Sequence, residues 1–485
     1  MVWSILLNNC GCKARENLAL PICSACRKGK YMKSFKHQTE IFERFRSQTY
    51  GALFCEMGTG KSRIAITLAE DAFTRKEITA CVIITTKGLV GNWLKHELPK
   101  HSTIAYSTFT WNLDKKLSFK GPLYFLVNVD GLLANAFPET FKAFLKENPS
   151  FMLIIDESTV VKNIKAARTK RCLAIARRAK RRFILSGQPI SNSPLDLFSQ
   201  MEMLTPECLG FKSLVAFRNR YAITERRTFG PRSFDVITGY RHLPELTEKV
   251  QQYASIVKKE ECLDLPPKIY RNIDVELTGQ QLNAYVELRD KALTYIEDHE
   301  ITAVNAVSLI NRLLQICAGQ IKVGDAYLSL ENNKLGLVRE LVDEHAGKTI
   351  VWTAYVNTAA DLSVALAKDG LWLPSGLALE KRHAILEQFK NDPTKKALIA
   401  NPASAGHGIT LVEATNTIYH SLSYSYENYI QSQDRNHRLG QTNSVLYTHL
   451  ITMGTLEDKV LSVLQGKGIM AGEVITSKVL REILQ

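Results

Sequence analysis

A glycine-rich segment near residue 58 constrains the fold of this chain more than any other feature. Residues 51–54, Gly-Ala-Leu-Phe, are apolar, and residues 56–62, Glu-Met-Gly-Thr-Gly-Lys-Ser, lead into the helical pattern of residues 64–68. A strand, a glycine-rich turn, a lysine followed by a hydroxyl residue, and a helix are the succession found in phosphate-binding loops. Glycines let backbone N–H groups approach phosphates closely, and the helix N-terminus adds a positive dipole end. The segment therefore predicts a phosphate loop.

Individual residues of this loop have expected roles. Lys61 would reach the β- and γ-phosphates of a nucleotide, and Ser62 would hold Mg²⁺. One position departs from the full pattern, because Cys55 stands where the first glycine would be. The alternative is a turn that merely happens to be rich in glycine, and the strand-to-helix context argues against it. The backbone groups expected to cradle the phosphates belong to Gly58, Thr59 and Gly60.

A second segment offers the carboxylates that an ATPase needs for Mg²⁺ and for water. Residues 151–155, Phe-Met-Leu-Ile-Ile, form a continuous apolar run that is typical of a buried parallel strand. Asp156 and Glu157 follow at its C-terminal end, where ligands bind in open α/β sheets. We expect Asp156 to hold Mg²⁺ and Glu157 to position the attacking water. The alternative is a polar turn after a core strand.

Apolar strands alternate with helical patterns in two parts of the chain, which predicts parallel sheets with helices on both faces. Further strands of the first part are expected at residues 81–86, 124–127 and 182–186. Those of the second part are expected at residues 349–353, 397–400, 417–419 and 445–447. No second phosphate loop accompanies the second set. We therefore expect an α/β protein with two lobes, of which only the first cradles a nucleotide.

Charge and hydropathy indicate the partners of such a protein. Its 485 residues include 62 Lys and Arg against 48 Asp and Glu, which gives a net charge of +14. This charge favours a polyanionic partner, nucleic acid first, although a merely basic enzyme would share it. No run of 18 apolar residues exists, and the N-terminus lacks the basic start of a signal peptide. We expect an intracellular protein that does not span a membrane.

A cysteine cluster precedes the phosphate loop. Four of the ten cysteines fall within the first 26 residues, and they are Cys10, Cys12, Cys23 and Cys26. Four thiolates suit a closed tetrahedral Zn²⁺ site, and the metal would supply the folding energy of so short a segment. Lys and Arg between residues 27 and 36 would give this zinc ribbon a basic edge for nucleic acid. Reduced thiols that hold no metal are the alternative.

Two arginines stand out in the polar segment of residues 429–441. Arg435 and Arg438 are three positions apart, so on a helix they would share a face. Two guanidinium groups aimed at a cleft could stabilise charge on a transferring γ-phosphoryl group. A solvated helix face is the alternative, and it would be preferred if the segment stood alone.

Taken in order, these segments resemble the motor of the Swi/Snf chromatin-remodeller family, in helicase superfamily two. Residues 35–38, Phe-Lys-His-Gln, are similar to the adenine-recognising glutamine motif, with Gln38 as its glutamine. Residues 56–62 resemble motif I, whose first glycine that family also commonly lacks. Residues 85–93 are similar to motif Ia. Residues 156–159, Asp-Glu-Ser-Thr, occupy motif II.

The resemblance continues in the same order to about residue 458. Residues 185–189, Leu-Ser-Gly-Gln-Pro, resemble motif III, although Gln188 replaces a usual threonine. Residues 351–353 resemble motif IV, and residues 405–411 resemble motif V. Residues 431–441 resemble motif VI, whose Gln-x-x-Asp-Arg-x-His-Arg-x-Gly-Gln form is the most family-specific. The cysteine cluster lies outside the resemblance, and the length is closer to the compact phage and bacterial members.

The resemblance implies two RecA-like lobes in tandem with helical protrusions, acting as a DNA-dependent ATPase that requires ATP and Mg²⁺. Expected domains are a zinc-binding segment at 1–34, a first lobe at 35–255 and a second lobe at 256–485. The expected catalytic residues are Lys61, Asp156, Glu157, Arg435 and Arg438. ATP would contact Gln38, Gly58, Thr59, Gly60, Lys61, Ser62, Asp156 and Gly408, with Ser62 and Asp156 holding Mg²⁺.

Family members mostly translocate on double-stranded DNA, and compact members remodel forks, drive branch migration or anneal strands, as in DNA repair and recombination. A strand-separating DNA or RNA helicase is one alternative, but RNA-type families usually carry more Arg and Gly in their final motif. A second alternative is a zinc-containing nucleic-acid adaptor with a degenerate ATP fold. The intact lysine, carboxylates and arginines of the site argue against the adaptor.

DNA contacts of a motor should be mostly to phosphate, because it must move over any sequence. Basic groups within residues 162–182, including Arg181 and Arg182, and within 218–232 are candidates. Solvated helix faces are the alternative for about half of them. By family position, Lys87, Gly88, Asn92, Trp93 and residues 406–410 lie near the DNA track. A core anchor is an equally expected role for Trp93.

Overall fold

The computed structural model describes residues 34–114, 121–190, 193–229, 232–298, 303–324, 326–405 and 409–465. The predicted zinc ligands Cys10, Cys12, Cys23 and Cys26 lie outside the described residues, as does Gly408. The chain divides into two compact units, one reaching Leu263 and the other starting at Asp264, with Ser193 and Ala222–Tyr240 grouped with the second. Among the described residues, no helix combines the length and the apolar character that a membrane crossing requires.

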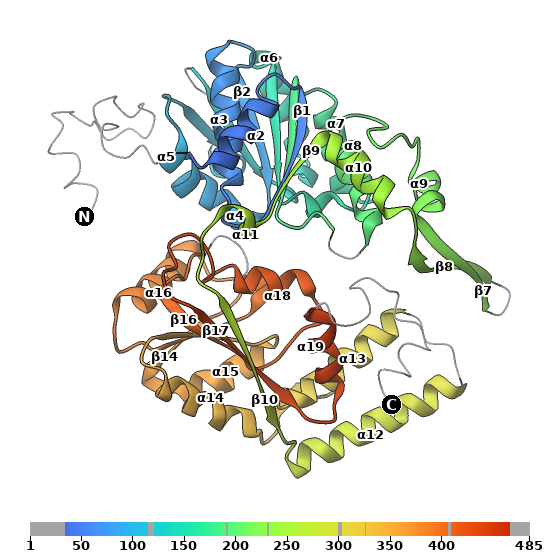
Figure 1. Ribbon diagram of the computed structural model, residues 1–485, viewed down its shortest axis with the longest axis vertical. Coiled ribbons are helices and arrows are strands. Elements are labelled where there is room, and N and C mark those ends of the chain that lie inside the picture. Colours follow the sequence, from blue (N-terminus) through green and yellow to red (C-terminus); the bar gives the residue numbers. More distant parts are fainter. Residues whose placement is uncertain are drawn as a thin grey trace. The chain divides into compact units, whose positions relative to one another are not determined.

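Seven parallel strands form one sheet in the described part of the first unit (Figure 1). These strands are β1 (Tyr50–Cys55), β2 (Ala80–Thr85), β3 (Ser107–Thr110), β4 (Leu123–Asn128), β5 (Phe151–Asp156), β6 (Arg181–Ser186) and β9 (Ala254–Val257). Their order across the sheet is β3-β4-β2-β5-β6-β1-β9. The phosphate loop and the Asp156-Glu157 pair therefore leave the same edge of the sheet, with only β6 between their strands.

Both faces of this sheet are buried, which explains why its strands are continuous apolar runs. In β1, Ala52 and Phe54 enter one core cluster, whereas Leu53 and Cys55 enter the other. The face of Leu53 is covered by α2 (Lys36–Phe45), α3 (Lys61–Thr74), α4 (Lys87–Asn92), the π-helical turn η2 (Trp93–Glu97) and α5 (Leu98–His101). The opposite face is covered by α6 (Phe137–Glu147), α7 (Ala167–Ala176), α8 (Leu197–Glu202), α9 (Leu214–Tyr221) and α10 (Leu243–Tyr253).

Six parallel strands form the sheet of the second unit within its described residues. The strands are β10 (Lys268–Val275), β13 (Lys348–Trp352), β14 (Gly370–Leu373), β15 (Ala397–Ala400), β16 (Ala414–Tyr419) and β17 (Val445–Thr452). Their order is β10-β17-β16-β13-β15-β14. Ile350 and Trp352 of β13 face one core cluster and Val351 faces the other, so this sheet is also buried on both faces.

Helices cover the second sheet on both faces, as Figure 1 shows. The face of Trp352 packs against α12 (Gly279–Asp298), α13 (Ala303–Cys317), α16 (Leu379–Asn391), α18 (Tyr426–Gln433) and α19 (Leu456–Leu464). The other face packs against α14 (Asn333–Glu344) and α15 (Val356–Leu366). The α/β class and the two parallel sheets predicted from the sequence are thus confirmed.

The remaining elements are short. Two antiparallel hairpins are formed by β7 (Ala222–Phe229) with β8 (Arg232–Tyr240), and by β11 (Gln320–Val323) with β12 (Ala326–Ser329). The short helices are η3 (Gly131–Leu133), η4 (Ser158–Val161), η5 (Pro194–Asp196), α11 (Lys259–Cys262), η6 (Ala367–Asp369) and α17 (Pro402–Ala405). The first unit reaches beyond the expected boundary at residue 255, because β9 pairs with β1 through Val257.

Candidate active site

The glycine-rich loop turns sharply between β1 and α3. Gly58 has a φ of 86° and Gly60 a φ of 95°, in the left-handed region that glycine adopts without steric cost. Gly60 is the N-cap of α3, and having no side chain it cannot cap the helix itself. The first backbone N–H groups of α3 therefore suit an anion, as in other helix N-termini that follow glycine-rich turns.

Lys61 lies at the carboxyl end of β1. The residue is 9% exposed, and its Nζ donates to the carbonyl oxygen of Cys55 at 2.7 Å. Gly187, in the turn after β6, stands close by. A Cβ added to Gly187 would lie 3.5 Å from Lys61 Nζ and 3.5 Å from the backbone nitrogen of Met57. Motif III and the phosphate loop are thus in close contact within the first unit.

Gln38 of α2 is buried against the phosphate loop. Its Nε2 donates to the carbonyl oxygen of Thr59 at 2.9 Å, and its Oε1 accepts the N–H of Phe35 at 3.2 Å. The ring Nε2 of His37 lies 2.8 Å from the same Thr59 oxygen. These contacts attach the start of α2 to the loop, so Gln38 positions the loop in this structure.

Asp156, at the end of β5, is held by three donors. Its Oδ2 accepts the indole N–H of Trp93 at 2.7 Å and the hydroxyl of Thr85 at 3.4 Å, while its Oδ1 accepts the N–H of Glu157 at 3.1 Å. Burial raises the pKa of Asp156, and the Trp93 hydrogen bond and the charge of Lys61 oppose that rise. The charge of the phosphate-loop lysine therefore acts on the predicted Mg²⁺ ligand.

Glu157 has a φ of 54° and is 7% exposed, which is an unusual backbone conformation for a buried carboxylate. The next residue, Ser158, donates from its hydroxyl to Oε1 of Gln200 at 2.7 Å. Gln200 Nε2 in turn donates to the carbonyl oxygens of Pro189 at 2.6 Å and Asp196 at 2.9 Å. Gln200 of α8 thus joins motif II to motif III, a role that the sequence did not indicate.

The two arginines of motif VI do not lie on a helix, in contrast to the expected shared helix face. Helix α18 ends at Gln433, and both arginines follow in the turn beyond it. Arg435 is 3% exposed and donates to the carbonyl oxygens of Gln431 at 2.9 Å and Ile409 at 3.4 Å. Arg438 is half-buried and donates to the hydroxyl of Thr410 at 2.8 Å. Motifs V and VI are therefore bonded to each other.

The positions of Trp93 and Arg181 bear on two expectations from the sequence. Trp93 was expected either near the DNA track or in the core, and Arg181 was expected to contact DNA. Trp93 is 1% exposed, so the core position is the one it occupies. Arg181, a candidate DNA contact, is 2% exposed, and its Nη2 donates to the carbonyl oxygens of Phe45, Arg46 and Gln48. Its neighbour Arg182 lies over the ring of Tyr50. The candidates that are exposed on or next to α7 are Lys165, Arg168, Lys170, Arg171, Arg177, Arg178 and Lys180.

Within the described ranges, no group of three or more His, Cys, Asp or Glu is arranged to hold a metal ion. The carboxylate of Asp156 still fits a Mg²⁺ ion held jointly with nucleotide phosphates, because such sites use one or two carboxylates plus substrate oxygens. Among the described cysteines, Cys55, Cys81, Cys172, Cys208 and Cys317 are buried free thiols, whereas Cys262 is only half-buried.

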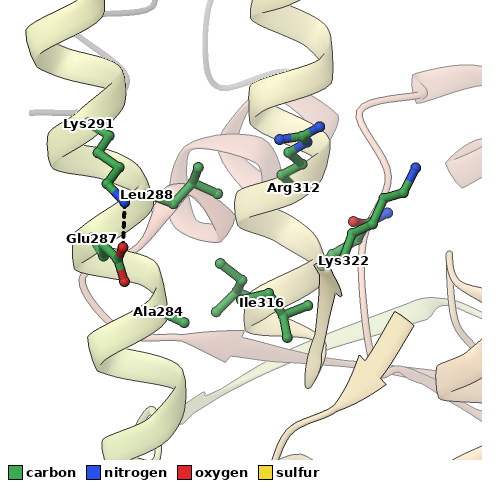
Figure 2. A pocket seen from close by; sticks show the side chains of 9 residues that line it. Ala284, Glu287, Leu288, Lys291, Arg312, Ile316 and Lys322 are labelled. Carbon is green, nitrogen blue, oxygen red and sulfur yellow. Dashed lines mark hydrogen bonds and ion pairs between the residues drawn. The ribbon is translucent and has the colours of Figure 1, made fainter. Parts of the chain in front are cut away.

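A separate hollow of about 160 Å³ lies in the second unit, between α12, α13 and β11 (Figure 2). Its apolar floor includes Ala284, Leu288 and Ile316. Arg312 and Lys322 lie at its rim, where Lys291 forms an ion pair with Glu287. None of the described residues predicted to contact ATP lines this hollow.

Comparisons with known proteins identify both parts of the chain. Residues 30–320 match the model of the SNF2-related domain, and residues 333–440 match that of the helicase conserved C-terminal domain. The chain is 26% identical over 439 residues to the DNA annealing helicase and endonuclease ZRANB3 of Bos taurus, covering 87% of this chain and 38% of that protein. It is 27% identical over 441 residues to an uncharacterized ATP-dependent helicase of Mycoplasma pneumoniae, covering 88% and 40%.

A solved structure is also similar. The Sulfolobus solfataricus SWI2/SNF2 ATPase core in complex with dsDNA has a TM-score of 0.42 and 23% identity, covering 93% of this chain and 95% of that one. The chain spans only about two fifths of the length of the two curated relatives. The SNF2-related domain alone matches more than half of the 485 residues, and the helicase C-terminal match includes Arg435 and Arg438 of motif VI. The chain therefore belongs to the SNF2-related family of helicase-type ATPases.

Proposed function

We propose that this protein is an ATP-dependent DNA translocase that moves on or remodels double-stranded or branched DNA. The observation that carries the proposal is the meeting of two motifs at one edge of the first sheet. Lys61 follows β1, Asp156 ends β5, and the lysine charge influences the carboxyl group. Membership of the SNF2-related family supports an ATP-driven motor, and the net charge of +14 favours a polyanionic track.

Each residue of the site has a proposed part in ATP hydrolysis. Lys61 and the first N–H groups of α3 bind phosphate oxygens, and Ser62 and Asp156 hold Mg²⁺. The metal, when bound, would neutralise charge that develops on the phosphates. Glu157 orients the attacking water from its buried position after β5. Gln200 keeps the segment after Glu157 connected to the turn after β6.

The arginines of motif VI are proposed to stabilise charge on the transferring γ-phosphoryl group. Arg438 suits this role better than Arg435, because it is only half-buried. Arg435 is nearly fully buried and is bonded to two carbonyl oxygens. We expect Arg438→Ala to lower turnover by about 100-fold or more with ATP binding retained, whereas Arg435→Ala should also lower stability.

The central test is ATP hydrolysis with different nucleic acids. Wild-type protein and Lys61→Ala would be assayed alone and with duplex DNA, forks, four-way junctions, single-stranded DNA and RNA. We expect duplex or branched DNA to stimulate the wild type and Lys61→Ala to stay inactive. Stimulation by RNA alone would favour an RNA helicase. Negligible hydrolysis by both proteins at saturating DNA would favour the adaptor.

Remodelling and strand separation need separate assays. A forked substrate that is converted into a four-way junction, without release of single strands from plain duplex, would support remodelling. Release of single strands from plain duplex would instead favour the strand-separating helicase. ZRANB3 is named as a DNA annealing helicase, so re-annealing of complementary strands is a third activity to measure.

The N-terminal cysteines are proposed to hold one Zn²⁺, on the strength of their number and spacing alone. Elemental analysis of protein purified without chelator should find about one zinc per chain. A Cys23→Ser/Cys26→Ser variant should lose it, while a Cys55→Ser/Cys81→Ser variant, which changes two buried core thiols, should keep it. If the wild-type protein contains no zinc, these cysteines are thiols that hold no metal.

A further inference from the structure

We propose that Trp93 is a positioning residue for the Mg²⁺ ligand Asp156, and that its indole N–H fixes the carboxylate in the orientation that binds the metal. The inference rests on the proposed ATPase function and adds a residue to it. Trp93 does not contact the nucleotide or the metal in this role. It acts through one hydrogen bond to Asp156 Oδ2, 2.7 Å long.

This hydrogen bond is the shortest of the three that Asp156 accepts. The Glu157 N–H lies 3.1 Å from Oδ1 and the Thr85 hydroxyl lies 3.4 Å from Oδ2. A hydrogen bond to a charged group is shorter and stronger than a neutral one, and here it lies in a buried site, where water does not compete. Trp93 is 1% exposed, so its indole cannot turn away from the carboxylate without repacking the core.

The backbone at Trp93 leaves α-helical geometry, which changes the direction of its ring. Helix α4 ends at Asn92, and η2 then makes one π-helical turn, in which the N–H of Leu98 bonds to the carbonyl oxygen of Trp93. The side chain of Asn92 donates to Glu97 at 3.2 Å across the same turn. A π-helical turn inserts an extra residue into a helix, changes the directions of side chains, and is frequent at functional sites.

The alternative is that Trp93 is a core side chain whose N–H only happens to find an acceptor, since a buried tryptophan usually bonds. Two other buried tryptophans show that the fold tolerates an unbonded ring. Among the described residues, Nε1 of Trp111 and Nε1 of Trp352 are buried and have no hydrogen-bond partner. The bond from Trp93 to Asp156 is therefore not explained by burial alone.

The test compares Trp93→Phe with Trp111→Phe, since both tryptophans lie in cores of the first unit. Each change removes a similar volume, but only Trp93→Phe removes a donor to Asp156. Equilibrium binding of a fluorescent ATP analogue would be titrated with Mg²⁺ and repeated in EDTA. We expect Trp93→Phe to need about tenfold more Mg²⁺ for half-maximal binding, as when other hydrogen-bond donors to a metal ligand are removed. Trp111→Phe should match the wild type, and binding in EDTA should be equal in all three.

Equal Mg²⁺ requirements for the two variants would overturn the positioning role. Wild-type protein whose nucleotide binding ignores Mg²⁺ would overturn the proposed ATPase as well, so the two failures are distinguishable. If Trp93→Phe does not fold, benzothienylalanine at position 93 keeps the ring shape and replaces N–H with sulfur. That protein should show the same increase in Mg²⁺ requirement, and a wild-type requirement would again reject the role.

Discussion

At the scale of single residues, the phosphate loop depends on a glycine that is constrained in two ways. Gly60 has a φ of 95°, and a Cβ placed on it would lie 2.2 Å from Nε2 of Gln38. An alanine there would be strained in its backbone and would push Gln38 away from the carbonyl oxygen of Thr59. The backbone strain alone is worth about 1 to 3 kcal/mol.

We therefore expect Gly60→Ala to lower both the melting temperature and the affinity for ATP, measured by thermal unfolding and equilibrium binding. Gly376→Ala is the matched control, because Gly376 has a φ of 78° and open space around its Cβ position. Gly376→Ala should lose only the stability that corresponds to the backbone strain. In the double variant Gln38→Ala/Gly60→Ala, relief of the clash should recover part of the lost stability. A Gly60→Ala protein no less stable than Gly376→Ala would contradict this account.

Arg181 offers a second prediction at this scale. Its guanidinium group is buried among three backbone carbonyl oxygens, and Glu77 lies 3.7 Å away. Arg181→Met would leave those carbonyls without their donor, so we expect a loss of about 2 to 4 kcal/mol in the free energy of unfolding. DNA affinity should stay close to that of wild type. Arg171 is an exposed arginine of α7. Arg171→Ala should therefore lower DNA affinity and leave the free energy of unfolding close to that of wild type. If Arg181→Met were as stable as the wild type, Arg181 would again be a candidate contact to DNA.

At the scale of elements, the second unit is held by a buried ion pair between two helices. Lys334 of α14 and Glu457 of α19 are each 1% exposed in their side chains and lie 2.6 Å apart. Glu457 also accepts the N–H of Thr452 at 2.8 Å. Breaking such a pair leaves a buried charge without compensation, which costs more than removing both charges.

Lys334→Met should therefore destabilise the protein by about 3 to 5 kcal/mol, measured by chemical denaturation. The double variant Lys334→Met/Glu457→Gln should lose less than Lys334→Met alone, because no unpaired charge remains. Lys291→Met breaks the exposed pair with Glu287 and should cost about 1 kcal/mol or less. A double variant that is the least stable of the three would contradict the argument from the unpaired charge.

His449 of β17 predicts how this unit responds to acid. Burial lowers the pKa of His449 to about 4, and its ring lies between the Tyr429 hydroxyl and Asn272 Oδ1, at 3.0 and 3.1 Å. In the unfolded chain its pKa is about 6.5. Between these values the unfolded chain binds a proton that the folded protein does not, so stability falls as pH falls from 6.5 toward 4.

The measurable loss between pH 6.5 and pH 5 is about 1 to 2 kcal/mol. Urea denaturation of wild type and His449→Gln at both pH values would isolate this contribution, because other buried histidines such as His420 titrate in both proteins. The difference in unfolding free energy between the two proteins should shrink by that amount at the lower pH. A constant difference would mean that His449 keeps an ordinary pKa in the folded protein.

The predictability of an element depended on where it lies in its sheet. Central strands such as β2 and β5 were predicted within a residue or two, because burial on both faces makes them apolar throughout. Strand β10 was missed because most of its residues are exposed and it lies at the edge of the described sheet, next to β17. The hairpin of β7 and β8 was not predicted, since Arg-rich segments carry no period-two apolar signal.

At the scale of the whole molecule, the predicted site residues divide by the kind of information they need. The loop glycines, Lys61 and the Asp156-Glu157 pair follow from local patterns, because a phosphate loop needs fixed residue types at fixed spacing. Gln200 and the hydrogen bond of Trp93 connect segments 42 and 63 positions apart, so no local spacing reveals them. The interior place of Arg181 likewise depends on the helix end and turn at residues 45–48 that surround it.

The net charge of +14 carried by the whole chain should make DNA binding sensitive to salt. A motor that contacts phosphates releases counterions when it binds, so affinity falls with salt in proportion to the number of phosphate contacts. We expect the DNA concentration for half-maximal ATPase stimulation to rise by at least about tenfold between about 50 and about 200 mM salt, as two or more contacts require. ATP binding without DNA should change much less, because Lys61 and Asp156 of the proposed ATP site are buried groups of the first unit.

Two exposed residues of α7 make this prediction specific. The variant Lys170→Ala/Arg171→Ala should weaken DNA binding similarly for every sequence and reduce the salt slope by about one for each charge that contacts phosphate. The control is Lys390→Ala, a lysine of the second unit that lies 3.7 Å from Glu387 and should leave the slope unchanged. A slope that both variants share with the wild type would remove α7 from the DNA contacts. A wild-type half-maximal concentration that is independent of salt would count against phosphate contacts anywhere on the chain, because binding through apolar contacts alone releases no counterions.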